Sequence, residues 1–165
     1  MPPKEQKQNA ERDAREWLAR AQDALEAGDL HAARRAAINA KQEEPRSVRA
    51  RELLGLAAYE LGQWQEALRE LLTFRRLSGR RTQDPAIARC YIERGQTDKA
   101  VDLLSDLARG DVDVGIWARA QAIRAEALTV LGRQDVATLV LDDAGRAVPQ
   151  ARELFDAVRA RLQLP

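Results

Sequence analysis

The sequence predicts an all-α protein, an α-α superhelix (solenoid) in which short helices stack in pairs. Two observations predict this class. Four glycines, Gly28, Gly62, Gly95 and Gly132, recur at spacings of 34, 33 and 37 residues in the 165-residue chain, and each ends an apolar-periodic stretch. Alanine occurs 30 times while aromatic residues make up only 4% of the chain, a composition that favours closely packed helices.

Small residues stand at fixed distances from each of these glycines. Alanine follows five residues later, at Ala33, Ala67, Ala100 and Ala137, and alanine or glycine precedes by seven residues, at Ala21, Gly55, Ala88 and Ala125. Small residues let two helices cross closely, and glycine supplies the positive φ that ends the first helix. Each unit is therefore a helix, a tight turn and a second helix, and four units are predicted at about 14–47, 48–81, 82–114 and 115–149.

The predicted elements follow in chain order. Residues 1–9 are expected to be a disordered tail, and helices are expected at about 10–27, 30–43, 48–61, 64–77, 85–94, 98–109, 114–131, 134–147 and 150–162. Asp84 and Pro85 predict an N-cap and a first helical residue after a polar loop. In the segment 150–165, Leu154, Phe155, Val158 and Leu162 form one apolar stripe on a helix that is otherwise charged, which is typical of a terminal capping helix.

The spacing and residue types resemble the tetratricopeptide repeat (TPR) over residues 14–149. The second unit carries the most matching residues, Leu54, Gly55, Tyr59, Gly62, Trp64, Ala67 and Phe74, and the other units match through Trp17, Pro45, Ala88, Tyr91, Ala125 and Pro149. The resemblance implies that the first helices of the units line a concave face, that the second helices form the convex back, and that the protein binds other proteins.

Composition limits the partners and the compartment. The formal net charge is +1, so no global field draws the chain to nucleic acid or to a membrane. No apolar run approaches the length of a membrane span, the first residues lack the apolar stretch of a signal peptide, and one cysteine forms no internal disulfide. Arginine far outnumbers lysine, as in GC-rich genomes. We expect a cytoplasmic bacterial protein with no membrane association.

Residues that could carry chemistry are few. The single histidine, His31, falls in a turn that is exposed in such repeats, and Cys90 falls on the inner side of a short helix. Asp106, Asp111 and Asp113 lack the further ligands and closing glutamate of a calcium loop. No glycine-rich phosphate loop occurs. The sequence therefore predicts no enzyme, no cofactor, no metal and no small-molecule substrate.

A partner-binding groove is predicted on the concave face. The positions that face the concave side in TPR proteins are occupied in this chain by Leu18, Gln22, Leu25, Arg49, Glu52, Leu56, Tyr59, Arg89, Ile92 and Glu126. Among these, Leu25, Leu56, Tyr59 and Ile92 are expected to form an apolar strip, and an exposed apolar patch usually marks an interaction site. Arg49 and Arg89 are expected to select acidic side chains. The alternative is that the C-terminal helix or the N-terminal tail of the chain itself fills the groove.

The leading hypothesis is an adaptor or scaffold that binds a peptide or helical segment of another protein. One alternative is an RNA-associated module that uses a basic patch of Arg75, Arg76, Arg80 and Arg81, although cations at a helix end also complement the helix dipole. The other alternative is self-association of the chain into a homo-oligomer through the groove.

Overall fold

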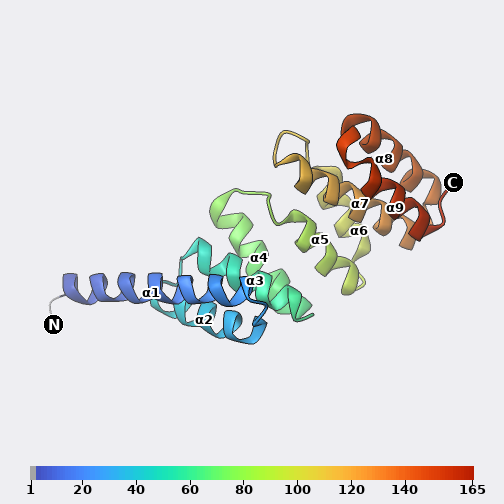
Figure 1. The fold of residues 1–165 in the computed structure, drawn as a ribbon. Coiled ribbons are helices and arrows are strands. Elements are labelled where there is room, and N and C mark those ends of the chain that lie inside the picture. Colours follow the sequence, from blue (N-terminus) through green and yellow to red (C-terminus); the bar gives the residue numbers. More distant parts are fainter. Residues whose placement is uncertain (1–2) are drawn as a thin grey trace. The chain divides into compact units, whose positions relative to one another are not determined.

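The computed structural model describes residues 3–165 as helices joined by short turns, with no strand in that range (Figure 1). The helices are α1 (Pro3–Glu26), α2 (Leu30–Glu43), α3 (Val48–Glu60), α4 (Trp64–Ser78), α5 (Asp84–Glu93), α6 (Thr97–Ser105), α7 (Val114–Val130), α8 (Gln134–Ala147) and α9 (Arg152–Leu162), with a 3-10 turn at Pro149–Ala151. The predicted all-α fold is confirmed.

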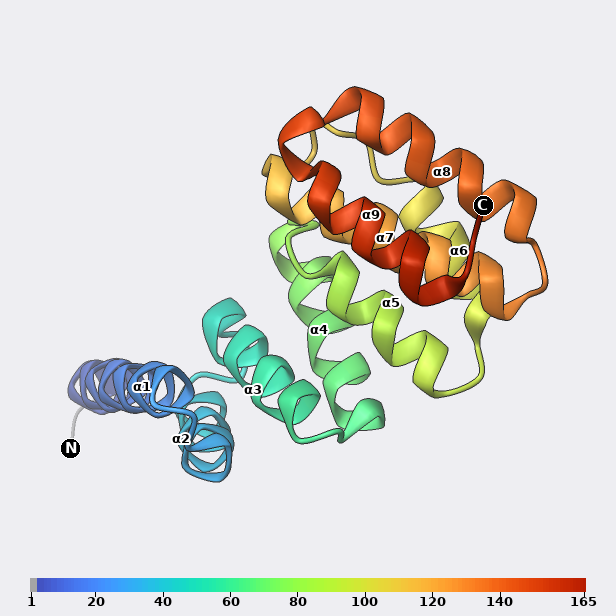
Figure 2. The ribbon, with the colours of Figure 1, turned by 45° about the vertical axis from the view of Figure 1, so that its right-hand side comes forward.

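The chain divides into two compact units, Met1–Arg80 (unit 1) and Arg81–Pro165 (unit 2). In unit 1, α1 packs on α2, α2 on α3 and α3 on α4, and α1 also contacts α3. In unit 2, α7 contacts α5, α6, α8 and α9, and α9 also packs on α8 (Figure 2). Within each unit the first helices of successive pairs therefore meet, as stacked helix hairpins require.

The turns inside the helix pairs are set by glycine. The four repeat glycines have φ between 69° and 77°, the left-handed region that other residues rarely adopt. Side-chain caps begin the next helices in unit 1, where Asp29 accepts a hydrogen bond from the Ala32 N–H at 3.0 Å and Ser47 accepts one from the Ala50 N–H at 3.3 Å. The regular spacing of the glycines in the sequence therefore places the ends of the first helices at the same spacing along the chain.

Small residues hold the helices close together. The alanines before and after the repeat glycines, Ala21, Ala33, Ala67, Ala88, Ala100, Ala125 and Ala137, are at most 1% exposed. Gly55 shows how close the approach is, because a Cβ atom there would lie 2.6 Å from Cδ2 of Leu71 on α4. The sequence prediction that small residues mark helix crossings is consistent with this packing.

Two predicted elements differ from the structure. Residues 3–9 are the first turns of α1 rather than a disordered tail, and residues 1 and 2 lie outside the described residues. The segment is rich in lysine, glutamate and glutamine, which favour helix, and Lys7 pairs with Glu11 one turn later at 3.8 Å. Helix α6 ends at Ser105 instead of about residue 109, and the chain then turns, so that Leu107 is buried and its carbonyl accepts a hydrogen bond from Trp117 Nε1 at 3.3 Å.

Candidate protein-binding surfaces

The first helices of unit 1 carry seven of the predicted groove residues. Leu18, Gln22 and Leu25 lie on α1, and Arg49, Glu52, Leu56 and Tyr59 lie on α3, which α1 contacts. Leu18 and Leu25 are only half-buried and pack against the core cluster around Leu53 and Leu54. Leu56 and Tyr59 are also half-buried, so each of the four apolar side chains keeps one side exposed.

Charged groups in this part of unit 1 are already paired. Arg49 Nη1 donates to Glu52 Oε2 at 2.6 Å, and Arg49 Nη2 donates to the Gln22 side chain. Glu52 is only 6% exposed, which a carboxylate tolerates because it has this cationic partner. Arg49 thus links α1 to α3 within the unit, and its selection of acidic partner side chains stays a prediction.

An aromatic pair stands at the end of the α3 to α4 turn. The rings of Tyr59 and Trp64 meet edge to face, with centroids 5.7 Å apart and planes at 74°. The contact orients the Tyr59 ring while leaving it partly exposed. Tyr59 is therefore a rigid aromatic side chain at the surface, which is the kind of residue that anchors protein interfaces.

The remaining predicted groove residues lie in unit 2, on α5 (Arg89 and Ile92) and α7 (Glu126). Glu126 accepts hydrogen bonds from Arg89 and from Arg161 of α9, so one carboxylate ties three helices together. The role predicted for Arg89, selection of acidic side chains, stays a prediction for a side chain that already has an internal partner. Ile92 is half-buried against the core of unit 2.

An open groove of about 350 Å³ lies between α7 and α9. Its lining combines small and branched apolar side chains with three charged ones, and consists of Arg119, Ala122, Ile123, Glu126, Leu154, Ala157, Val158 and Arg161. Sequence reasoning found Glu126 but missed most of the others as binding residues. Helical spacing would have found three of them, because positions 119, 122 and 123 share the face of α7 that carries Glu126.

One arginine of the predicted basic patch, Arg81, is engaged by neighbouring groups of its own unit. Arg81 donates to Asp84 Oδ2 at 2.8 Å, to Asp111 Oδ2 at 3.2 Å and to the carbonyl oxygens of Leu103 and Asp106 at 3.1 and 2.7 Å. Its side chain is only 16% exposed, because it holds the start of α5 to the segment after α6. Asp84, expected as an N-cap, is the fully buried first residue of α5 and the partner of Arg81.

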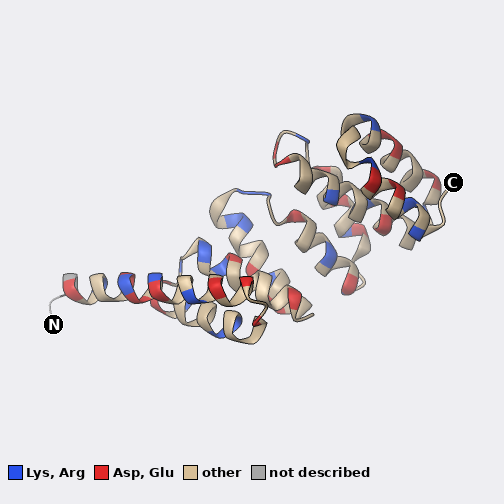
Figure 3. Cartoon of the chain, viewed as in Figure 1, with Lys and Arg blue, Asp and Glu red and all other residues tan. Residues whose placement is uncertain are grey.

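The other three arginines of that patch lie in unit 1. Arg75 and Arg76 are in the last turn of α4, where they complement the helix dipole, and Arg80 follows the terminal Gly79 with its guanidinium 5.8 Å from the centre of the Phe74 ring. Basic and acidic segments are interspersed along the helices of both units (Figure 3).

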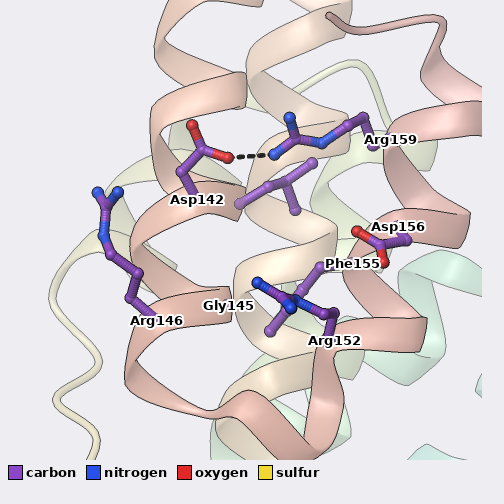
Figure 4. A pocket seen from close by; sticks show the side chains of 8 residues that line it. Asp142, Gly145, Arg146, Arg152, Phe155, Asp156 and Arg159 are labelled. Carbon is purple, nitrogen blue, oxygen red and sulfur yellow. Dashed lines mark hydrogen bonds and ion pairs between the residues drawn. The ribbon is translucent and has the colours of Figure 1, made fainter.

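A second cavity, of about 400 Å³, lies between α8 and α9 and is mostly polar. Figure 4 shows Asp142 of α8 paired with Arg159 of α9 across it, with Arg152 and Asp156 nearby. Arg159 also donates to the carbonyl oxygen of Pro165 at 2.8 Å. Phe155, which is 2% exposed, points under this polar layer. A helix with an apolar inner side and a charged outer side fits the predicted cap.

The residues considered for chemistry are not assembled into a reactive site. Cys90 is fully buried, and burial raises the pKa of its thiol to about 11, so it is a neutral thiol at pH 7. His31 is exposed near the start of α2, and Asp106 and Asp111 both pair with Arg81. Within residues 3–165 no group of three histidine, cysteine or carboxylate side chains is placed to hold a metal ion.

Comparison with known proteins identifies the fold. No family model and no curated protein sequence matches the chain. Solved structures do match. A mutant O-GlcNAc transferase of Thermobaculum terrenum aligns over 84% of the chain at 24% identity and a TM-score of 0.69, and the chain spans only 26% of that protein. A thermophilic TPR protein of Thermus thermophilus aligns over 90% of the chain and 80% of its own length, at 21% identity and a TM-score of 0.68.

The MamA protein aligns over 91% of this chain and 86% of its own length, at 18% identity and a TM-score of 0.72. The chain has the tetratricopeptide-repeat fold. The predicted resemblance to TPR proteins is thereby confirmed at the level of fold. Among the described residues of the TPR chain, no helix is long and apolar enough to cross a membrane.

Proposed function

We propose that this TPR chain is a non-enzymatic adaptor or scaffold that binds a peptide or helical segment of another protein. The groove between α7 and α9 is the observation that carries the proposal, because it combines an open apolar floor with charged side chains at its border. Binding sites for protein segments have this composition, with apolar contacts for affinity and a few charges for orientation.

The charges at the border have different roles. Arg161 and Glu126 pair with each other across the groove and hold α9 against α7. Arg119 is exposed and has no carboxylate partner among residues 3–165. An acidic side chain of a bound segment would therefore meet Arg119, while Ile123 and Leu154 contact its apolar residues.

Unit 1 carries a second surface that could bind the same kind of partner segment. Leu18, Leu25, Leu56 and Tyr59 are half-buried first-helix residues, and the Arg49 network fixes α1 relative to α3 beneath them. The order in this surface lowers the entropic cost of binding. We infer that each unit contributes a separate contact to a partner. The bacterial origin and cytoplasmic location predicted from the sequence remain predictions.

The proposal is tested by selecting peptides from a displayed library on the immobilised full chain and measuring their affinities for variants. Ile123→Glu places a charge on the floor of the α7 to α9 groove and should weaken the selected peptides at least tenfold. Val130→Glu is the matched control, because Val130 lies on the same helix, is 66% exposed and lines no groove described above. Val130→Glu should melt like the parent chain, whereas Ile123→Glu should melt lower because Ile123 packs partly against the core of unit 2, so affinities are measured well below both melting temperatures.

The unit 1 contact is tested by the double change Leu56→Ala with Tyr59→Ala. If these side chains form a hot spot, peptides that contact unit 1 should lose roughly 2 kcal/mol or more of binding free energy. Peptides that bind all of these variants as tightly as the parent chain would reject the proposal. Sedimentation of the free chain as a dimer that Ile123→Glu dissociates would replace it with self-association.

A further inference from the structure

Arg124 of α7 is a half-buried cation that pairs with no carboxylate among residues 3–165. Its Nε atom is buried and has no hydrogen-bond partner, and its Nη1 atom makes one long hydrogen bond to the Gln121 side chain, at 3.4 Å. Burial and the positive charge of Arg133 lower the pKa of Arg124 below its usual value. The folded chain therefore carries an electrostatic cost at this position that none of its described carboxylates offsets.

Five other half-buried arginines of the chain have carboxylate partners, although the Nε atoms of Arg51 and Arg159 among them also lack a hydrogen bond. These pairs are Arg34 with Glu66, Arg51 with Glu70, Arg81 with Asp84, Arg89 with Glu126 and Arg159 with Asp142. A buried polar group that departs from such a pattern needs a physical explanation.

Arg124 lines a groove of about 430 Å³ between α7 and α8. The α7 side of the groove is Trp117, Gln121 and Arg124, and the α8 side is Val136, Leu139, Val140, Asp143, Ala144 and Ala147. The two helices are joined by a three-residue turn and run antiparallel, so Arg124 lies about level with Val140. Its guanidinium is thus surrounded mainly by apolar side chains.

No residue of α6 lines the groove. A longer α6 was predicted, but the helix ends at Ser105 and the chain turns away, with Arg109 Nη1 donating to the Ala147 carbonyl at 2.8 Å at one end of the groove. Leu139 is left 59% exposed in the middle of α8. Asp143, the only carboxylate in the lining, is paired with Arg146 one turn later. The groove therefore has an apolar wall and one unsatisfied positive charge.

We propose that the α7 to α8 groove is a second binding site, separate from the α7 to α9 groove, and that it takes an amphipathic helix of a partner protein that carries one aspartate or glutamate. Leucine-type residues of that helix cover Leu139 and Val140, and its carboxylate pairs with Arg124. An incoming carboxylate gains a charge-assisted bond in this groove, because Arg124 is already partly desolvated and its Nε atom has no hydrogen-bond partner.

The probes are two acetylated and amidated helical peptides of about 16 residues with a leucine stripe at i, i+3 and i+7. They differ in one position on the same face, glutamate in one and glutamine in the other. Fluorescence anisotropy with the full chain should give at least tenfold tighter binding of the glutamate peptide. The Arg124→Gln variant should remove this preference without lowering the melting temperature, and Leu139→Asp should weaken both peptides.

Arg119→Gln is the matched control, because Arg119 lies on the same helix and lines the other groove, so the glutamate preference should survive it. Four results would overturn the proposal: no binding of either peptide, equal affinities for the parent chain, a preference that persists in Arg124→Gln, or a preference that Arg119→Gln removes. A parent chain that sediments as a dimer and becomes monomeric with Leu139→Asp would also overturn it, because a second copy would then occupy the groove.

Discussion

Glu70 of α4 is the residue whose replacement most directly tests the packing of unit 1. Its side chain is fully buried, and its two oxygens accept hydrogen bonds from Lys41 Nζ at 3.1 Å, Arg51 Nη1 at 2.7 Å and Arg69 Nε at 3.1 Å. Lys41 lies on α2 and Arg51 on α3, so one carboxylate joins three successive helices. The change Glu70→Gln keeps the shape of the side chain and removes its charge.

The cost of that change follows from these contacts. Lys41 and Arg51 are 23% and 22% exposed, and both lose the negative charge opposite them, since the one oxygen of glutamine still accepts from one cation while its NH2 group faces the other; we take the loss as about 1.5 kcal/mol for each cation. Arg69 is 63% exposed and returns to water at little cost. We therefore expect Glu70→Gln to lower the free energy of unfolding by about 3 kcal/mol, a large share of the stability of a small domain.

Urea denaturation followed by circular dichroism measures this difference, with Glu60→Gln as the control, since Glu60 is an exposed glutamate at the end of α3. The pH dependence is an independent check. Burial alone would raise the pKa of Glu70, but the hydrogen bonds from Arg51 and Lys41 outweigh it and lower that pKa.

A lowered pKa means that Glu70 stabilises the fold above its unfolded-state pKa of about 4.3, and that this stability is lost as the pH falls through the folded-state value. Glu70→Gln should therefore flatten the loss of stability of the parent chain below about pH 4.3. A loss smaller than about 0.5 kcal/mol at pH 7, or an equally steep acid profile in the variant, would refute the assignment of Glu70 as the electrostatic link between these helices.

The remaining predictions concern close packing and two groups considered for function. Gly55→Ala should lower the free energy of unfolding by about 1–3 kcal/mol in urea denaturation, because the added Cβ would overlap the Leu71 side chain. Alanine's better helix propensity does not offset this overlap. Gly110→Ala is the control and should not lower stability, because the space around Gly110 is open. Alkylation of Cys90 by iodoacetamide at pH 8 should be slow in the folded chain and fast in urea, because burial raises its pKa to about 11; equal rates would show that the thiol is exposed. Arg81→Gln should lower the melting temperature without changing RNA retention, and the reverse outcome would restore the RNA-associated alternative.

Helix positions were predictable from the sequence because the repeat encodes them in local signals. The spacing of four glycines with positive φ fixed the ends of the first helices, and the predicted α2 (30–43) and α8 (134–147) match the structure at both ends. The end of α6 was not predictable in this way. It depends on Arg81, about 25 residues earlier in the chain, whose bonds to the Leu103 and Asp106 carbonyls hold the segment after α6.

The candidate site was less predictable from the sequence. The match to TPR positions predicts which face of a helix a residue lies on, but not which side chains it contacts there. Leu56 and Tyr59 lie half-buried at the surface of α3, as their positions implied. Arg49 and Arg89 occupy such positions as well, yet each is used to hold neighbouring helices together. An arginine binds its own chain when one of the chain's carboxylates lies opposite it in the fold. That carboxylate is 3 residues away in sequence for Arg49 (Glu52) and 37 residues away for Arg89 (Glu126), so sequence spacing alone does not reveal it.

Helix α7 contributes residues to both proposed binding grooves. It contacts four other helices and carries few charged residues, Arg119, Arg124 and Glu126. Five residues of α-helix place Arg119 and Arg124 about 140° apart around the axis, one in each groove. Both are unpaired with any carboxylate of the described chain, whereas Glu126 on the same helix is paired twice. A protein of net charge +1 can therefore favour acidic partner segments at two separate places, because the selectivity comes from two individual arginines rather than from the field of the whole molecule.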